Sequence, residues 1–298
     1  MLNNFFKIVK KRYNRFKQRR IESNLLKIKN DYIKRGKEPW TPGYNEFKTE
    51  EILNSISEKD VLKSFKDKIV PNNFGYRIDE RIVEYTWIFS KLQNNKATFL
   101  DAGSTFNFDY LLGTGLISKK QKYIYTFYPE KLSFNEKQVS YVYGDLRDLP
   151  FKDDFFEEIV CQSTIEHIDM DNSIYGYNIE HNKNETKKSY EYLLVIEELI
   201  RVLKSKGKLL ITFPFGKFEN HGFFQQFDDE MLVRLTTLFN NRGDFEIDYF
   251  KYEKEGWRFA NRNELRNVAS YNPHTGKGKL EDGAAHCRSV ACVSFNKK

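Results

Sequence analysis

The chain lacks the residues that mark an exported, disulfide-linked or membrane-spanning protein. Its three cysteines, Cys161, Cys287 and Cys292, are too few and too scattered for a disulfide framework or a zinc site, which favours a reducing compartment. No apolar run approaches the roughly 18 residues that a spanning helix needs. The N-terminus also has no continuous apolar segment of the kind that a signal peptide requires. These absences predict a cytoplasmic location, and the 40% apolar content of the 298 residues is enough for a substantial core.

Acidic residues are absent from residues 1–20, which hold eight Lys or Arg and carry a net charge of +8. The remainder holds 41 basic and 42 acidic side chains, so the body of the chain is nearly neutral. Leu2, Phe5, Val9 and Phe16 recur at helical spacing between the basic residues, which predicts a basic amphipathic helix. Such a helix suits peripheral contact with an anionic membrane, packing on the body with a solvated basic face, or a nucleic-acid backbone. The near-neutral body makes nucleic acid the least favoured partner.

The residue pattern divides the chain into three parts. Residues 1–43 form the basic helix and a linker, GKEPWTPG, whose prolines and glycines end the helical pattern. Residues 44–95 show helical patterns that predict an extension packed on the core. Residues 96–298 alternate apolar strands with helices, which predicts an α/β fold with a doubly wound, largely parallel sheet. The seven expected strands are ATFLD (97–101), KYIYTF (122–127), SYVYG (140–144), FFEEIVC (155–161), GKLLITF (207–213), FEIDYF (245–250) and SVACVSF (289–295).

In a sheet of this kind, ligands bind beyond the carboxyl ends of the strands, near the point where strand order reverses. The segments that follow the strands are therefore the candidates for a site. They are residues 101–107 after the first strand, 144–147 after the third, 162–167 after the fourth and 214–216 after the fifth.

The stretch YGDLRDLPFKDDFFEEIVCQSTIEHI (143–168) resembles the middle of the class I S-adenosylmethionine-dependent methyltransferases, in the group that acts on small molecules and sugars in polysaccharide biosynthesis. A GD dipeptide, an LPF turn, a buried strand and an EHI ending follow one another in that order. EELIRVLKSKGKLLITFPFG (197–216) extends the similarity. The resemblance implies a Rossmann-like sheet of seven strands, six parallel and one antiparallel, and S-adenosylmethionine as cofactor.

The resemblance also implies roles for individual residues near the first two strands. Asp101 would face the cofactor's ammonium group, and the backbone of Gly103 and Ser104 would lie beside its methionine portion. Two departures stand out. The usual second and third loop glycines are Thr105 and Asn107 here, and Asn107 is a residue that tolerates left-handed geometry. The acid that normally grips the ribose hydroxyls at the end of the second strand is also missing; Thr126, Tyr128 and Glu130 are the substitutes that the sequence offers.

The remaining implied roles follow the third and fourth strands. Asp145 would accept a hydrogen bond from the adenine amine, Leu146 would offer its amide to a ring nitrogen, and Ser163 would complete the cofactor-binding set. His167 would take a proton from a substrate hydroxyl as the methyl group transfers. Each residue also has a plain structural reading: Asp101 and Asp145 as turn-capping residues, and His167 as a hydrogen-bonded structural histidine.

A long polar loop, residues 169–186, follows the fourth strand and predicts a lid over the acceptor site. Asp169, Asp171, Asn172 and Tyr175 are the lid residues expected to contact a polyhydroxylated acceptor. The two aspartates could also hold a divalent ion, but we expect no metal. HGFFQQF (221–227) and Trp257 could add aromatic walls.

The function expected from these patterns is methyl transfer from S-adenosylmethionine to a sugar hydroxyl or another small polar acceptor, in the cytoplasm or at the inner face of a membrane. A catalytically inactive methyltransferase-like binding protein is the alternative, supported by the missing ribose acid. A nicotinamide-dependent sugar epimerase or reductase is disfavoured because the Gly-rich fingerprint near the N-terminus and a Tyr-x-x-x-Lys pair after the fourth strand are absent.

Overall fold

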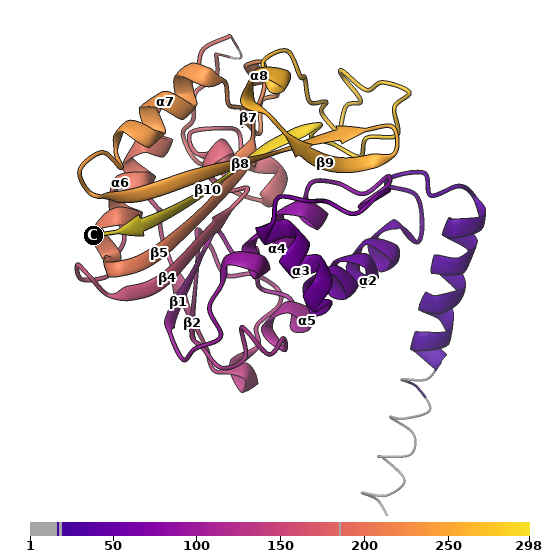
Figure 1. The fold of residues 1–298 in the computed structure, drawn as a ribbon, viewed down its shortest axis with the longest axis horizontal. Coiled ribbons are helices and arrows are strands. Elements are labelled where there is room, and N and C mark those ends of the chain that lie inside the picture. Colours follow the sequence, from indigo (N-terminus) through magenta and orange to yellow (C-terminus); the bar gives the residue numbers. More distant parts are fainter. Residues whose placement is uncertain (1–16, 18–19, 185) are drawn as a thin grey trace, which may run out of the picture.

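The computed structural model describes residues 17, 20–184 and 186–298. Most of the expected basic helix of residues 1–20 lies outside them. Residues 20–34 form a helix that projects from the body (Figure 1), and none of the described helices is long and apolar enough to cross a membrane.

One eight-stranded sheet runs through the body in the order β3-β2-β1-β4-β5-β10-β8-β9. The pairings among β3, β2, β1, β4 and β5 are parallel, whereas those of β10 with β5 and β8, and of β9 with β8, are antiparallel. The strands are β1 (Thr98–Ala102), β2 (Gln121–Thr126), β3 (Val139–Tyr143), β4 (Phe156–Gln162), β5 (Leu203–Pro214), β8 (Gly243–Glu253), β9 (Gly256–Ala260) and β10 (Ser289–Lys297); a separate pair is β6 (Glu219–Asn220) with β7 (Gln225–Gln226). The predicted α/β class and all seven predicted strands are confirmed.

The eighth strand, β9, was not expected. Its five residues pair with the end of β8 as a hairpin, so β9 forms the edge of the sheet. The segment is short, and its glycine and arginine interrupt the apolar pattern that marks the other strands, so only the pairing with β8 defines it.

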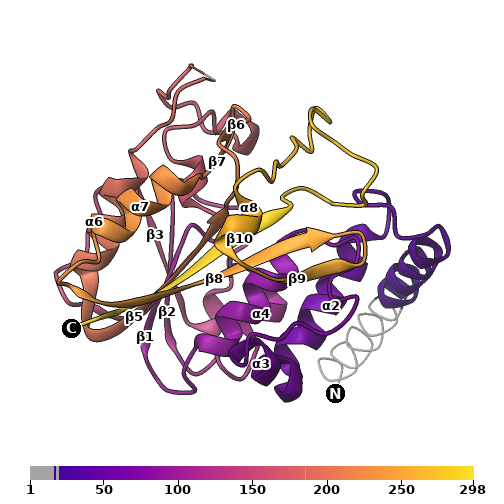
Figure 2. The same cartoon turned by 45° about the horizontal axis from the view of Figure 1, so that its top comes forward.

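Helices cover both faces of the sheet, but not by regular alternation with the strands (Figures 1 and 2). The connections after β1 and β2 contain only the four-residue helix α5 (Asp109–Leu112) and one 3-10 turn (Asn135–Lys137). That face is covered instead by the N-terminal helices α2 (Tyr44–Ser57), α3 (Lys59–Lys66) and α4 (Arg81–Lys91). The other face carries α6 (Tyr192–Val202) and α7 (Asp229–Thr237), and α8 (Arg262–Leu265) follows β9.

The helix α4 is the element that fixes the N-terminal extension to the sheet. Every residue from Ile82 to Ser90 is buried. Trp87 is fully buried, and its indole N–H donates to a carboxylate oxygen of Asp248 on β8 over 2.9 Å. Asp248 also pairs with Lys68, at 2.8 Å, so the buried carboxylate has both a cation and a hydrogen-bond donor. The sheet face therefore depends on α4 for its cover.

Replacing Trp87 by Ala should lower the free energy of unfolding by about 3–5 kcal/mol, because the change leaves a large cavity and removes a donor from a buried carboxylate. Urea unfolding measures the difference. Leu194→Ala on α6, where the side chain is half exposed, is the matched control and should change it by less than about 0.5 kcal/mol. Equal effects of the two substitutions would contradict the anchoring role of α4.

Candidate functional site

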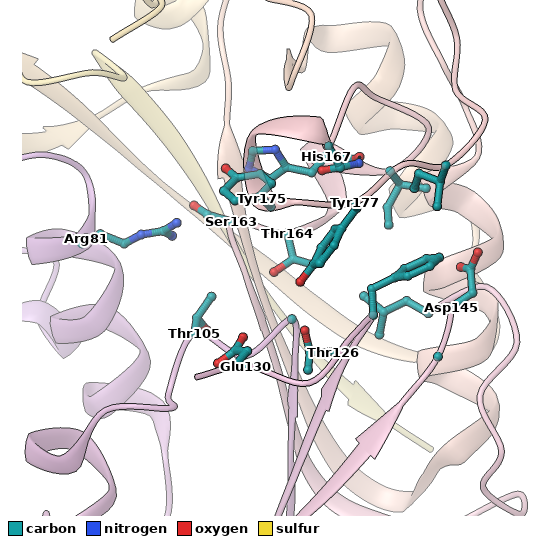
Figure 3. A pocket seen from close by; sticks show the side chains of 17 residues that line it. Arg81, Thr105, Thr126, Glu130, Asp145, Ser163, Thr164, His167, Tyr175 and Tyr177 are labelled. Carbon is teal, nitrogen blue, oxygen red and sulfur yellow. The ribbon is translucent and has the colours of Figure 1, made fainter. Parts of the chain in front are cut away.

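A cavity of about 290 Å³ lies where the carboxyl ends of β1, β2, β3 and β4 meet (Figure 3). The strand-end segments chosen from the sequence, apart from the one after β5, thus converge on one space. Its lining also includes residues of the loop after β4 and one residue of α4. The lining residues are Arg81, Gly103, Thr105, Thr126, Phe127, Glu130, Gly144, Asp145, Leu146, Ser163, Thr164, His167, Ile168, Asn172, Tyr175, Tyr177 and Ile179.

Asp101, the residue before the last of β1, does not line the cavity, which corrects the expectation that it faces a cofactor. Its side chain is fully buried and accepts hydrogen bonds from the backbone N–H of Thr105, at 3.1 Å, and of Phe106, at 2.8 Å. Burial raises the pKa of Asp101 to about 7, although the donors of the loop act in the opposite direction. The carboxylate closes the loop that follows β1, as its structural reading proposed.

Two successive residues of this loop adopt left-handed backbone geometry, Gly103 at φ +121° and Ser104 at φ +62°. A Cβ atom on Gly103 would lie 2.1 Å from Oγ1 of Thr164, so the loop passes directly against the end of β4. Ser104 does not line the cavity, and its buried hydroxyl has no partner among the described residues. The left-handed positions of the loop are therefore Gly103 and Ser104, and Asn107 does not adopt this geometry.

Asn107 acts instead through its side chain. Its amide nitrogen donates to a carboxylate oxygen of Glu130 over 2.7 Å, and the Tyr141 hydroxyl donates to its amide oxygen over 2.9 Å. Glu130, four residues beyond the end of β2, is thereby held at the cavity. Thr126 also lines the cavity, whereas Tyr128 does not. A carboxylate is therefore present near the end of β2, but it comes four residues after the strand instead of at its end.

Asp145 and Leu146 line the cavity after β3. The Asp145 carboxylate accepts from the Arg147 guanidinium at 2.7–3.1 Å and from the Arg147 backbone N–H at 2.9 Å. Partial burial by itself would raise the pKa of Asp145, but these contacts with Arg147 lower it. The backbone N–H of Leu146 has no acceptor among the residues that the structure describes, so it is available to a ligand.

Ser163 lines the cavity after β4, and its hydroxyl donates to Glu84 on α4 over 2.5 Å. Glu84 is fully buried and also accepts from Thr212 of β5 at 2.7 Å and from Arg81 at 2.9 Å. Neither Arg81 nor Glu84 was expected at the site from the sequence. Neither belongs to a strand end; helix α4 brings them there from the N-terminal extension.

His167 lines the cavity on a 3-10 turn (Ile165–His167) that follows β4. Its Nδ1 lies 2.7 Å from the carbonyl oxygen of Phe223, an arrangement in which Nδ1–H donates. Burial lowers the pKa of His167 to about 4, which keeps the imidazole neutral at neutral pH. The Nε2 atom lies 4.0 Å from Glu166 and has no hydrogen bond within the described residues. His167 therefore presents an unprotonated nitrogen.

The loop after β4 closes one side of the cavity with Asn172, Tyr175 and Tyr177. Tyr175 meets the His167 ring edge to face, with 5.6 Å between ring centroids. Tyr177 packs on Phe127 of the loop after β2, at 5.8 Å, so the lid loop and the β2 end share an aromatic contact.

The two lid aspartates are outside the cavity, which corrects their expected contact with an acceptor. Asp169 accepts from the backbone of Asn182 and from the Ser189 hydroxyl, and Asp171 accepts from the backbone of Ser173. Both carboxylates therefore hold the loop in shape. Trp257 and the aromatic residues of 221–227 are not part of the cavity lining either.

Comparison with known proteins finds a methyltransferase sequence pattern in the part of the chain that forms much of the cavity. The sequence model of a methyltransferase domain matches residues 125–211, the part of the chain that runs from β2 to β5. A protein of Methanocaldococcus jannaschii described as uncharacterized, MJ0638, is 27% identical over 207 residues, which cover 64% of this chain and 75% of that protein.

Solved structures with a similar arrangement include the YcgJ protein of Bacillus subtilis, at 14% identity, a TM-score of 0.41 and coverage of 70% of this chain and 94% of that one. Another is the 1,6-didemethyltoxoflavin-N1-methyltransferase of Burkholderia thailandensis, at 13% identity, a TM-score of 0.39 and coverage of 68% and 72%. The domain match spans the ends of β2, β3 and β4 at the cavity, so this part of the chain has the sequence pattern of a methyltransferase domain.

Replacing Gly103 by Ala should weaken binding of S-adenosylhomocysteine by about tenfold or more, because the new Cβ collides with Thr164 and moves the loop at the cavity wall. Calorimetric titration measures the affinity. Gly276→Ala is the control, because Gly276 also has a positive φ, +74°, but open space where a Cβ would lie. Unchanged binding by the Gly103 variant, or an equal loss in the control, would contradict this role.

Proposed function

We propose that the protein is an S-adenosylmethionine-dependent methyltransferase that methylates a hydroxyl group of a small polar acceptor, such as a sugar or glycan of surface polysaccharide biosynthesis. The observation that carries the proposal is His167: a neutral imidazole at the cavity, fixed through Nδ1 and with Nε2 uncommitted. A hydroxyl is a weak nucleophile, so its methylation benefits from a base, whereas a stronger nucleophile needs only positioning.

The cavity residues fit the cofactor. Asp145 and the free Leu146 N–H offer the acceptor and donor that an adenine edge requires, and Glu130 offers a carboxylate for the ribose hydroxyls. Gly103 lines the cavity on a loop that packs against Thr164, and its backbone would lie beside the methionine portion. The volume of about 290 Å³ is close to the lower end of the range for ligand pockets. When bound, S-adenosylmethionine supplies an activated sulfonium methyl group.

His167 would act on the acceptor. The bound cofactor would supply the methyl group to the acceptor oxygen, and the electron pair of its carbon–sulfur bond would stay on sulfur. The hydroxyl proton moves to Nε2 of His167, while Nδ1–H keeps its hydrogen bond to Phe223. The low pKa of His167 favours a base that is unprotonated before the reaction, and the lid residues Asn172 and Tyr175 would limit access of water to the acceptor.

The alternative, an inactive methyltransferase-like binding protein, depended on the missing acid at the end of β2. Glu130 weakens that argument, because Asn107 holds its carboxylate at the cavity. A polar lid with two cavity-lining tyrosines suits a hydroxylated acceptor, since aromatic rings pack on sugar faces while their hydroxyls form hydrogen bonds. This supports a sugar without identifying it.

Peripheral membrane contact through residues 1–20 belongs to the same proposal. The described helix that follows them, residues 20–34, exposes Ile21, Leu25, Leu26 and Ile28, an unusual number of large apolar side chains. Together with the eight basic residues of the first 20, these side chains support a helix that lies on an anionic membrane surface.

His167→Asn should reduce methyl transfer about 100-fold or more and leave the affinity for S-adenosylhomocysteine within twofold. Transfer of tritiated methyl groups to a panel of nucleotide sugars and lipid-linked glycans measures the first, and calorimetry the second.

The lowered pKa of His167 has a further consequence. The unfolded chain takes up the histidine proton near pH 6.5 and the folded protein only near pH 4, so the free energy of unfolding should fall between these values as the pH drops. The Asn variant should lose part of this dependence; an unchanged pH profile and unchanged transfer would contradict the role of His167.

Deletion of residues 1–20 should abolish sedimentation of the protein with vesicles that contain anionic lipid, because it removes the charge of +8. Binding should also weaken as salt rises. Vesicles of neutral phosphatidylcholine are the control and should bind neither form. Equal sedimentation of the full chain and the deletion variant would overturn the proposed membrane contact.

A further inference from the structure

The order of the strands sets the order of the chemical groups along the cavity. From β3 to β4 the strands run β3-β2-β1-β4, so Asp145, Glu130, Gly103 and Ser163 follow one another across the strand ends. Three strand spacings separate the first from the last, about 14 Å. An extended adenosine with an amino-acid tail has room along this line, and with its adenine at Asp145 its tail lies toward β4.

Arg81 lies on α4 at one side of the cavity, and its side chain extends toward Ser163 at the end of β4 (Figure 3). Two neighbours on the same helix locate it. Tyr85, one turn later, donates to the carbonyl oxygen of Thr105 in the loop after β1. Glu84 accepts from Ser163 at the end of β4. Arg81 is therefore fixed between the loops after β1 and β4, the strands at which the order of the sheet reverses.

The Arg81 guanidinium has N–H donors that no described residue uses. Its Nη1 donates to Glu84 over 2.9 Å, and its other N–H groups donate to no residue that the structure describes. The side chain is 27% exposed, within the cavity wall. Among the described lining residues Arg81 is the only one with a permanent positive charge, since His167 is neutral at neutral pH. The carboxylates of the lining, Glu130 and Asp145, belong to the β2 and β3 ends.

We propose that Arg81 binds the carboxylate of the cofactor's methionine portion, and that Glu84 positions it. A guanidinium with a free edge is the donor that fits a carboxylate, and the cavity has no other described cation for it. The N-terminal extension is thus part of the cofactor site rather than a cover for the sheet alone. The inference depends on the cofactor and not on the acceptor proposed above.

The test is calorimetric titration of the full chain with S-adenosylmethionine and with decarboxylated S-adenosylmethionine, which differ only in the carboxylate. The wild type should bind the intact compound about 10- to 100-fold more tightly. Arg81→Gln should weaken binding of the intact compound by a similar factor and leave binding of the decarboxylated compound within twofold. Arg81→Lys, which keeps the charge but loses the forked geometry, should fall between the two. Arg266→Gln, an exposed arginine paired with Asp229, is the control and should change neither affinity.

Each other outcome has a distinct meaning. Equal affinity of the wild type for the two compounds overturns the proposal without any variant, so it stays testable even if Arg81→Gln fails to fold. Equal weakening of both compounds by Arg81→Gln also overturns it and assigns Arg81 a purely structural role. Unchanged binding of both compounds with loss of methyl transfer overturns it in favour of an anionic acceptor at Arg81. Binding of neither compound by well-folded wild type would instead contradict the cofactor itself.

Discussion

The buried carboxylate of Glu84 is the interaction on which the site depends. It accepts hydrogen bonds from Arg81, Ser163, Thr212 and Gln162 and so joins helix α4 to the ends of β4 and β5. A buried carboxylate is stable only with such a set of donors, and removing one of them lowers the free energy of unfolding. The same contacts fix the loop after β4, from which His167 reaches the cavity. The N-terminal helices therefore both cover the sheet and determine the geometry at its ligand-binding edge.

The part of the site that follows from local sequence was predictable. Parallel strands bring their carboxyl ends to one edge, so Gly103, Asp145, Leu146, Ser163 and His167 could be placed at one cavity from the strand pattern, whereas Thr126 was named from the family resemblance. The seven main strands were predictable for the same reason, because each is a short apolar run between turn residues. A catalytic or binding role for each of these residues remains a prediction.

The rest depends on contacts between distant segments. Asp101 and Ser104 were assigned to the cofactor by the family resemblance, but the Asp101 carboxylate bonds the backbone of its own loop and the Ser104 hydroxyl is buried outside the cavity lining. Glu130 lines the cavity late in the sequence, and Asn107, 23 residues earlier, holds its carboxylate there. Arg81 and Glu84 lie in a helix whose apolar stripe was visible, and the signal that could have found them is a charged pair three residues apart within that helix. Pattern reading treats such charges as a solvated face, whereas here one of them is fully buried.

The central claim is that strand order lays the cofactor across the edge of the sheet, with its adenosine toward β3 and its amino-acid tail toward α4. A crystal structure of the full chain with S-adenosylhomocysteine tests it most directly. The account predicts adenine beside Asp145 and Leu146, the ribose hydroxyls within hydrogen-bond distance of Glu130, and the carboxylate on Arg81. A ligand bound in the reverse direction, or outside the cavity of Gly103 and Ser163, would contradict it.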